Sequence, residues 1–137
     1  MDTRVETTLE KRKKGYNCAQ SVACTYCDMV GVDEKLMFQM TETLGAGMAG
    51  TMEGHCGAVA AACVLASMKQ STGNLDAPDS VKATYKLSSQ ILEKFTEKNQ
   101  SVICKELKGV QTGKALRSCP GCIQDAAELV EEVLFEG

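Results

Sequence analysis

Apolar residues recur along this chain at the spacing of an α-helix. Segments with this period run over Val5 to Tyr16, Cys18 to Val30, Asp33 to Leu44, Asp76 to Asn99, Ser101 to Leu107 and Ser118 to Leu134. In the long fourth segment, the residues expected to face inward are Val81, Tyr85, Leu87, Ile91, Leu92 and Phe95. No stretch alternates apolar and polar positions as a strand would, so the pattern predicts an all-α fold.

One further segment is apolar almost all round. It runs from Gly57 to Met68 and reads G-A-V-A-A-A-C-V-L-A-S-M. A helix without a polar face is normally buried, and its alanines let neighbouring helices approach closely. We therefore predict a compact bundle of five or six helices around this central Ala-rich helix. The length of 137 residues predicts that residues 1–137 form a single domain.

Composition and charge exclude two classes of partner. Eighteen acidic and fifteen basic residues give a net charge of −3, and no basic stripe or Trp is present, so we expect no nucleic-acid partner. The charge run from Glu10 to Lys14 is predicted to be a solvated helix face. No apolar run is long enough for a membrane, and the first residues lack the apolar core of a signal peptide, so we expect a cytoplasmic protein. The Ala-rich helix and the seven Met residues make a homodimer a reasonable expectation.

Eight cysteines in a cytoplasmic chain favour metal binding or redox chemistry over structural disulfides. Cys18, Cys56 and Cys119 each fall in the first turn of a predicted helix, and Cys104 lies in a short segment bordered by loops. These four thiols are predicted to meet at one end of the bundle. Three other cysteines, Cys24, Cys27 and Cys63, fall inside predicted helices. They are predicted to be packing residues.

A glycine-rich loop precedes Cys56. Its glycines are Gly45, Gly47, Gly50, Gly54 and Gly57. Such a run suits a chain that must take φ > 0 or let another group approach its amides, although a tight turn with Cys56 as a small core residue gives the same pattern. His55 beside Cys56 is a candidate additional ligand or base. Cys122 forms C-P-G-C with Cys119, a spacing typical of thiol redox motifs at helix N-termini, and it is a candidate additional ligand or a replacement for Cys119 as the fourth ligand.

Several of these motifs together resemble the C_GCAxxG_C_C family of proteins proposed to be redox-active. The motifs are G-Y-N-C-A-Q-S-V at 15–22, C-G-A-V-A-A at 56–61, the isolated Cys104, and C-P-G-C-I-Q-D-A-A-E-L-V-E-E from Cys119. The resemblance implies that the family's cysteines are Cys18, Cys56, Cys104 and Cys119. It also implies a helical domain similar to the iron-sulfur-bearing region of split-Soret cytochrome c. Ala61 stands where the family has Gly, Cys122 has no counterpart in the pattern, and the C-x-x-C-H needed for covalent haem is absent.

Three chemistries suit such a set of cysteines. The leading interpretation is an iron-sulfur cluster on Cys18, Cys56, Cys104 and Cys119, used for electron transfer or redox sensing. The alternatives are metal-free thiol/disulfide exchange, in which Cys56 pairs with Cys119 or Cys122, and a structural zinc site. The partner would be a redox protein or a small molecule, and an oxidoreductase acting on a small substrate uses the same residues.

Overall fold

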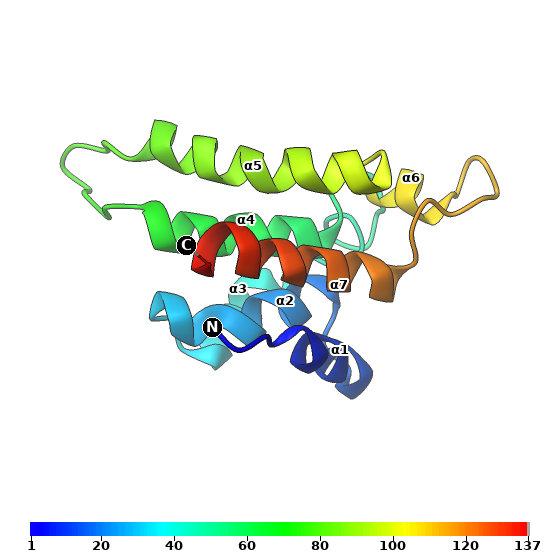
Figure 1. Ribbon diagram of the computed structural model, residues 1–137, viewed down its shortest axis with the longest axis horizontal. Coiled ribbons are helices and arrows are strands. Elements are labelled where there is room, and N and C mark those ends of the chain that lie inside the picture. Colours follow the sequence, from blue (N-terminus) through cyan, green and yellow to red (C-terminus); the bar gives the residue numbers. More distant parts are fainter. Residues whose placement is uncertain (137) are drawn as a thin grey trace.

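The computed structural model describes residues 1–136 and is helical throughout (Figure 1). Its α-helices are α1 (Val5–Lys14), α2 (Cys18–Tyr26), α3 (Glu34–Thr41), α4 (Gly57–Gln70), α5 (Val81–Asn99), α6 (Cys104–Lys108) and α7 (Cys119–Val130). Short 3-10 turns follow α2 and α3, and a π-helical turn, η3 (Glu131–Phe135), follows α7. The all-α prediction is confirmed; the described chain has seven α-helices, including the short α6, where five or six were predicted.

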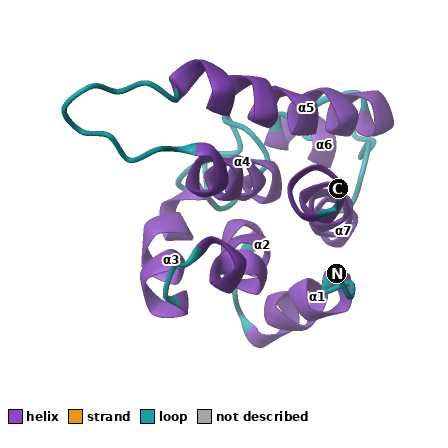
Figure 2. Ribbon diagram, turned by 60° about the vertical axis from the view of Figure 1, so that its left-hand side comes forward, coloured by secondary structure: helices purple, strands orange, loops and turns teal. Residues whose placement is uncertain are grey.

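The Ala-rich helix α4 lies in the middle of the fold. Figure 2 shows α5 and α6 on one side of it, α2 and α3 on the other, and α7 beside it. Ala58, Ala61 and Ala62 have no exposed surface, and neither has Leu65. Small side chains on α4 let α2, α5 and α7 pack closely against it, so α4 occupies the central position that its apolar surface predicts. Among the described residues, no helix combines the length and the apolar character that a membrane span requires.

Helix starts are fixed by polar side chains that the sequence places just before them. The side chain of Asn17 accepts a hydrogen bond from the Gln20 N–H, and the Gln20 side chain accepts one from the Asn17 N–H, which completes a capping box at α2. Ser118 caps α7 by accepting a hydrogen bond from the Gly121 N–H at 3.1 Å. These caps place Cys18 and Cys119 at the first position of their helices.

The predicted start and inner face of α5 need correction. The helix begins at Val81 rather than at Asp76 or Pro78. Side-chain hydrogen bonds hold the preceding residues in a loop, because Thr72 donates to Asp79 and its N–H donates to the Ser80 hydroxyl. Tyr85 is 70% exposed and Val81 is 49% exposed, because the first turns of α5 lie opposite the exposed end of α4. The inner face of α5 consists of its later residues, of which Ile91 and Phe95 are fully buried.

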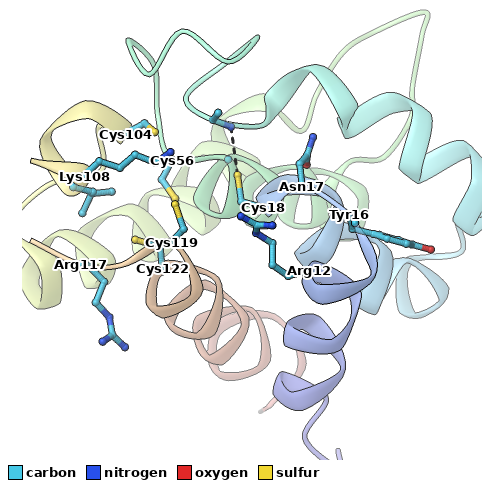
Figure 3. A pocket seen from close by; sticks show the side chains of 14 residues that line it. Arg12, Tyr16, Asn17, Cys18, Cys56, Cys104, Lys108, Arg117, Cys119 and Cys122 are labelled. Atoms are coloured by element: carbon cyan, nitrogen blue, oxygen red, sulfur yellow. Dashed lines mark hydrogen bonds between the residues drawn. The ribbon is translucent and has the colours of Figure 1, made fainter. Parts of the chain in front are cut away.

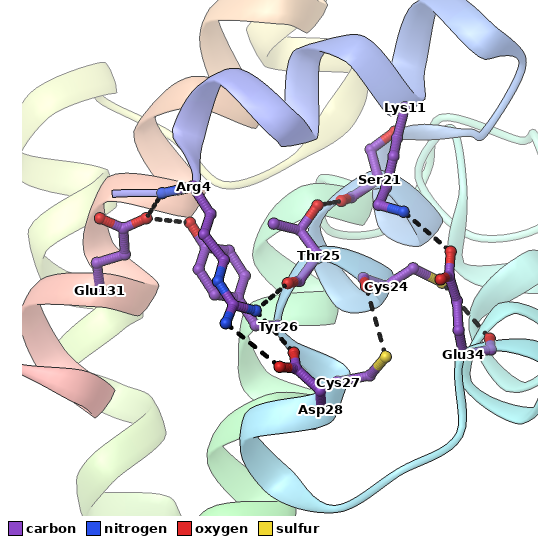
Figure 4. A network of polar contacts seen from close by, with 10 residues as sticks. All are labelled: Arg4, Lys11, Ser21, Cys24, Thr25, Tyr26, Cys27, Asp28, Glu34 and Glu131. Carbon is purple, nitrogen blue, oxygen red and sulfur yellow. Dashed lines mark hydrogen bonds and ion pairs between the residues drawn. The ribbon is translucent and has the colours of Figure 1, made fainter. Parts of the chain in front are cut away.

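A buried carboxylate joins the two ends of the chain (Figure 4). Glu131 accepts a hydrogen bond of 2.5 Å from the Tyr26 hydroxyl and one of 2.7 Å from the Arg4 N–H. The Arg4 guanidinium also pairs with Asp28 at 2.7 Å. These contacts hold the start of α1 against α2 and the last turn of α7. They lie apart from the cysteine pocket described next.

Candidate functional site

A pocket of about 220 Å³ lies where the first residues of four helices meet. Five of its lining residues are cysteines, namely Cys18, Cys56, Cys104, Cys119 and Cys122. Figure 3 shows these side chains around one space, with α1 and α6 contributing residues from opposite sides. The structure thus brings together the four cysteines that the sequence singled out, and it adds Cys122 from the second turn of α7.

Helix starts supply four of the five thiols. Cys18, Cys104 and Cys119 are the first residues of α2, α6 and α7, and Cys56 is the N-cap residue of α4. At a helix start the unpaired backbone N–H groups and the positive end of the helix dipole favour negative charge. The pocket is therefore suited to thiolates or to an anionic group bound among them.

Backbone hydrogen bonds hold two of the cysteines side by side. The Cys56 N–H donates to the Val102 carbonyl at 2.7 Å, and the Cys104 N–H donates to the Gly54 carbonyl at 3.0 Å. The backbone of His55 pairs with that of Ile103 in an isolated antiparallel bridge. The glycine loop and the segment before α6 thus position Cys56 and Cys104 together, although almost fifty residues separate them in sequence.

The glycine loop covers the cysteines so closely that side chains have no room at key positions. A Cβ atom on Gly57 would lie 2.5 Å from the Cys18 Sγ and 2.8 Å from the Leu44 carbonyl oxygen. A Cβ atom on Gly47, where φ is +71°, would lie 2.6 Å from the Cys104 Cβ. Of the other loop glycines, Gly45 approaches Asn17, Gly54 approaches Gly47, and Gly50 has a positive φ in open space. The loop also supplies a donor, because the Ala46 N–H contacts the Cys18 Sγ at 3.5 Å.

Cys56 has the strongest tendency in this pocket to form a thiolate. A hydrogen bond with the Cys122 thiol lowers the pKa of Cys56 to about 7, despite its burial. The N–H groups of Val59 and Ala58 and the charge of Lys108 act in the same direction. The same hydrogen bond raises the pKa of Cys122, which stays protonated as the donor. This pair is a nucleophilic sulfur beside a second thiol.

Burial makes Cys18 and Cys104 weaker acids than an ordinary thiol. Burial raises the pKa of Cys18, partly offset by the Ala46 N–H. Burial also raises the pKa of Cys104, and the charge of Lys108 opposes it. Cys18 and Cys119 are half-buried, whereas Cys56, Cys104 and Cys122 are buried. The pocket therefore has two thiols near its edge and three behind them.

The remaining cysteines and His55 lie outside the pocket lining. The Cys24 thiol donates to the Glu34 carbonyl at 3.8 Å, and the Cys27 thiol donates to the Cys24 carbonyl at 3.4 Å (Figure 4). Burial raises the pKa of Cys24 to about 12, so this thiol stays neutral. Cys27 starts a 3-10 turn rather than continuing the helix, and Cys63 is half-buried on α4. The structure keeps these residues apart from the five thiols.

A single metal ion has no ready-made site in the structure. Across residues 1–136, no three Cys, His, Asp or Glu side chains are grouped so that they could hold one ion. Tetrahedral zinc needs four ligands close to one point, with sulfur about 2.3 Å from the metal. A polynuclear cluster differs, because it distributes its thiolates over several metal ions and so over the wall of a pocket.

The buried carboxylate of Asp125 holds Arg117, one of the residues that line the pocket. The Asp125 side chain is 1% exposed and accepts hydrogen bonds from Lys98 at 2.7 Å, Asn99 at 3.1 Å and Arg117 at 3.0 Å. Burial alone would raise the pKa of Asp125, but these hydrogen bonds outweigh it and hold the pKa below its ordinary value of 3.8. Arg117, which lines the pocket, is thereby fixed to α7.

Stability should depend on this carboxylate in acid. Because the folded pKa of Asp125 is lower than the unfolded one, its contribution is fully present above about pH 4 and is lost as pH falls through the folded pKa. We expect Asp125→Asn to lower the free energy of unfolding near pH 7 by about 1–3 kcal/mol, and the difference from wild type to shrink at lower pH. Urea unfolding at several pH values measures both. A difference that stays constant down to the acid limit would contradict this assignment.

The fold and the pocket define a helical protein with a cluster of cysteine thiols at converging helix starts. Residues 16–133 match the family described as "Putative redox-active protein (C_GCAxxG_C_C)". The chain belongs to this family, as its motifs indicated. No curated protein and no solved structure matches it.

Sequence reasoning missed the three cations of the pocket lining, Arg12, Lys108 and Arg117. Arg12 belongs to the charge run that was predicted to be a solvated helix face. Its position at the pocket depends on how α1 packs against the rest of the fold. Lys108 lies four residues after Cys104 on α6, so one helical turn separates them. That spacing is the signal that could have identified Lys108.

Proposed function

We propose that this redox-active family member binds an iron-sulfur cluster through Cys18, Cys56, Cys104 and Cys119. One observation carries the proposal: thiols from the starts of four separate helices line a single pocket of about 220 Å³. Thiolates are the usual ligands of such clusters, often four in number. No carboxylate or imidazole side chain is among the residues that line the pocket. When bound, the cluster would supply one-electron transfer.

The surroundings of the thiols support the same proposal. Ligand sulfurs carry negative charge, and hydrogen bonds to them both stabilise that charge and tune the reduction potential. The Ala46 N–H points to Cys18, and the N–H groups of Ala58 and Val59 point to Cys56. Lys108 adds a positive charge near Cys56 and Cys104. The half-buried Cys18 and Cys119 leave an edge open for exchange of electrons with a redox protein or small molecule.

Alkylation of the folded protein tests which thiols would hold the cluster. Three cysteines are half-buried: Cys18, Cys63 and Cys119. We expect all three to react with an alkylating reagent in reduced, metal-free protein, because partial exposure permits attack. After anaerobic loading with iron and sulfide, Cys18 and Cys119 should be protected, while Cys63 should react as before. Peptide mass spectrometry reads each site, and equal reactivity of Cys18 and Cys63 after loading would refute the ligand set.

A second candidate function rests on the Cys56 and Cys122 thiols, which line the same pocket and of which Cys122 is the main cause of the lowered pKa of Cys56. In this alternative the Cys56 thiolate attacks the disulfide of a partner or small molecule and releases one of its halves as a thiol. Cys122 then attacks the mixed disulfide, which forms a Cys56–Cys122 bond and releases the other half as a second thiol. The effect of the Cys122 thiol on the pKa of Cys56 supports Cys122, rather than Cys119, as the partner in this alternative.

A further inference from the structure

The mouth of the cysteine pocket is positively charged in a protein whose net charge is −3. Its charged lining residues are Arg12, Lys108 and Arg117, and no Asp or Glu lines it. Arg117 is committed to Asp125 through two hydrogen bonds. The other two cations, Arg12 and Lys108, have no such carboxylate partner in the described chain.

Arg12 and Lys108 are exposed, and neither forms an ion pair or a side-chain hydrogen bond within the described chain. In Figure 3, Arg12 extends from α1 toward Cys18, and Lys108 extends from α6 toward Cys56. The charge of Lys108 acts on both Cys56 and Cys104, which places its ammonium group near these thiols. Two cations thus approach the pocket from opposite sides with no anion between them.

We propose that Arg12 and Lys108 bind a small anionic ligand in the mouth of the cysteine pocket. The inference rests on the proposed function only in naming the class of small molecule that binds beside that site. A guanidinium and an ammonium group are the side chains that hold carboxylate, phosphate or sulfate oxygens through charge-assisted hydrogen bonds. The whole pocket, including the space proposed for the cluster, measures about 220 Å³, so a ligand at its mouth is a small molecule.

Calorimetric titration of the anaerobically purified full chain tests this proposal, with succinate as the probe and the neutral succinamide as its matched control. We expect succinate to bind and succinamide not to bind. Arg12→Gln and Lys108→Gln should each weaken succinate binding about tenfold, because each removes one charge-assisted interaction. Lys13→Gln, which removes a neighbouring exposed cation outside the pocket lining, should leave the affinity unchanged. Added salt should weaken the binding of wild type.

Iron content separates the outcomes. The titration is done on both metal-free and loaded protein, so failure to bind iron would refute the proposed function without affecting the result for the anion. Equal affinity for succinate and succinamide, or wild-type affinity in the Arg12→Gln, Lys108→Gln double variant, would overturn the anion site. The anion site would also be overturned if succinate did not bind to wild type and the double variant lost its iron. That result would mean that Arg12 and Lys108 balance the charge of the cluster.

Discussion

Cys56→Ser is expected to remove most or all of the bound iron and sulfide while leaving the helical fold intact. Cys56 is 7% exposed and is the N-cap residue of α4, and the Cys122 thiol and the Val59 and Ala58 N–H groups lower its pKa. A serine oxygen does not replace a soft thiolate ligand. The change is small and lies at a loop boundary, so circular dichroism should show the wild-type helix content. Iron and acid-labile sulfide analysis after anaerobic purification measures the loss.

Cys63→Ser is the matched control for this prediction. It makes the same substitution on the same helix, about two turns further along, at a residue outside the pocket lining. Cys63 is half-buried and lies beside the Ser88 hydroxyl, so a serine hydroxyl at this position is neither fully buried nor without a partner. We therefore expect both metal content and stability to stay near wild type. Full iron content in Cys56→Ser, with loss in Cys63→Ser, would reverse the assignment of the site.

Gly57→Ala is expected to damage both the fold and the site through one added methyl group. That methyl would lie 2.5 Å from the Cys18 Sγ and 2.8 Å from the Leu44 carbonyl oxygen, so the glycine loop or α2 must move. Overpacking of this kind costs about 1–3 kcal/mol of unfolding free energy. Because the displaced atoms include a proposed ligand sulfur, iron binding should fall together with stability. Urea unfolding and iron analysis of the same preparation measure the two effects.

Gly113→Ala is the control for Gly57→Ala, because it strains the backbone at a residue outside the pocket lining. Gly113 has a φ of +75° with no atom within 4 Å of an added Cβ. Alanine there should cost about 1–2 kcal/mol through its left-handed conformation and should leave iron binding unchanged. If Gly57→Ala kept wild-type iron content and lost stability only to the extent of Gly113→Ala, the close contact between the loop and Cys18 would be refuted.

Much of the fold could be predicted because local signals and tertiary structure agree. Asn17 and Ser118 cap helices where their side chains predict a start, and the apolar surface of α4 predicts its burial. The predicted start of α5 was wrong, because hydrogen bonds across the preceding loop determine where the helix begins. The spacing of apolar residues carries no information about these hydrogen bonds. The predicted inner face of α5 was wrong at Val81 and Tyr85, because the first turns of α5 lie opposite the exposed end of α4.

The candidate site could be predicted in part. Cys18, Cys56 and Cys119 could be placed at helix starts and Cys104 in a short segment bordered by loops, and these positions line one pocket. The contact between Cys56 and Cys122 depends on how α4 packs against α7, and the approach of Arg12 depends on the packing of α1. Neither follows from spacing along the chain. The ligand role of the four cysteines and the identity of the metal remain predictions.

Iron and acid-labile sulfide analysis of the anaerobically purified wild-type chain, with its visible absorption spectrum, tests the central claim most directly. The account predicts iron and sulfide together, with an absorption band that bleaches on reduction. Zinc alone, or no metal even after loading with iron and sulfide, would contradict it. In the metal-free case, a Cys56–Cys122 disulfide in oxidised protein would establish the thiol/disulfide alternative instead.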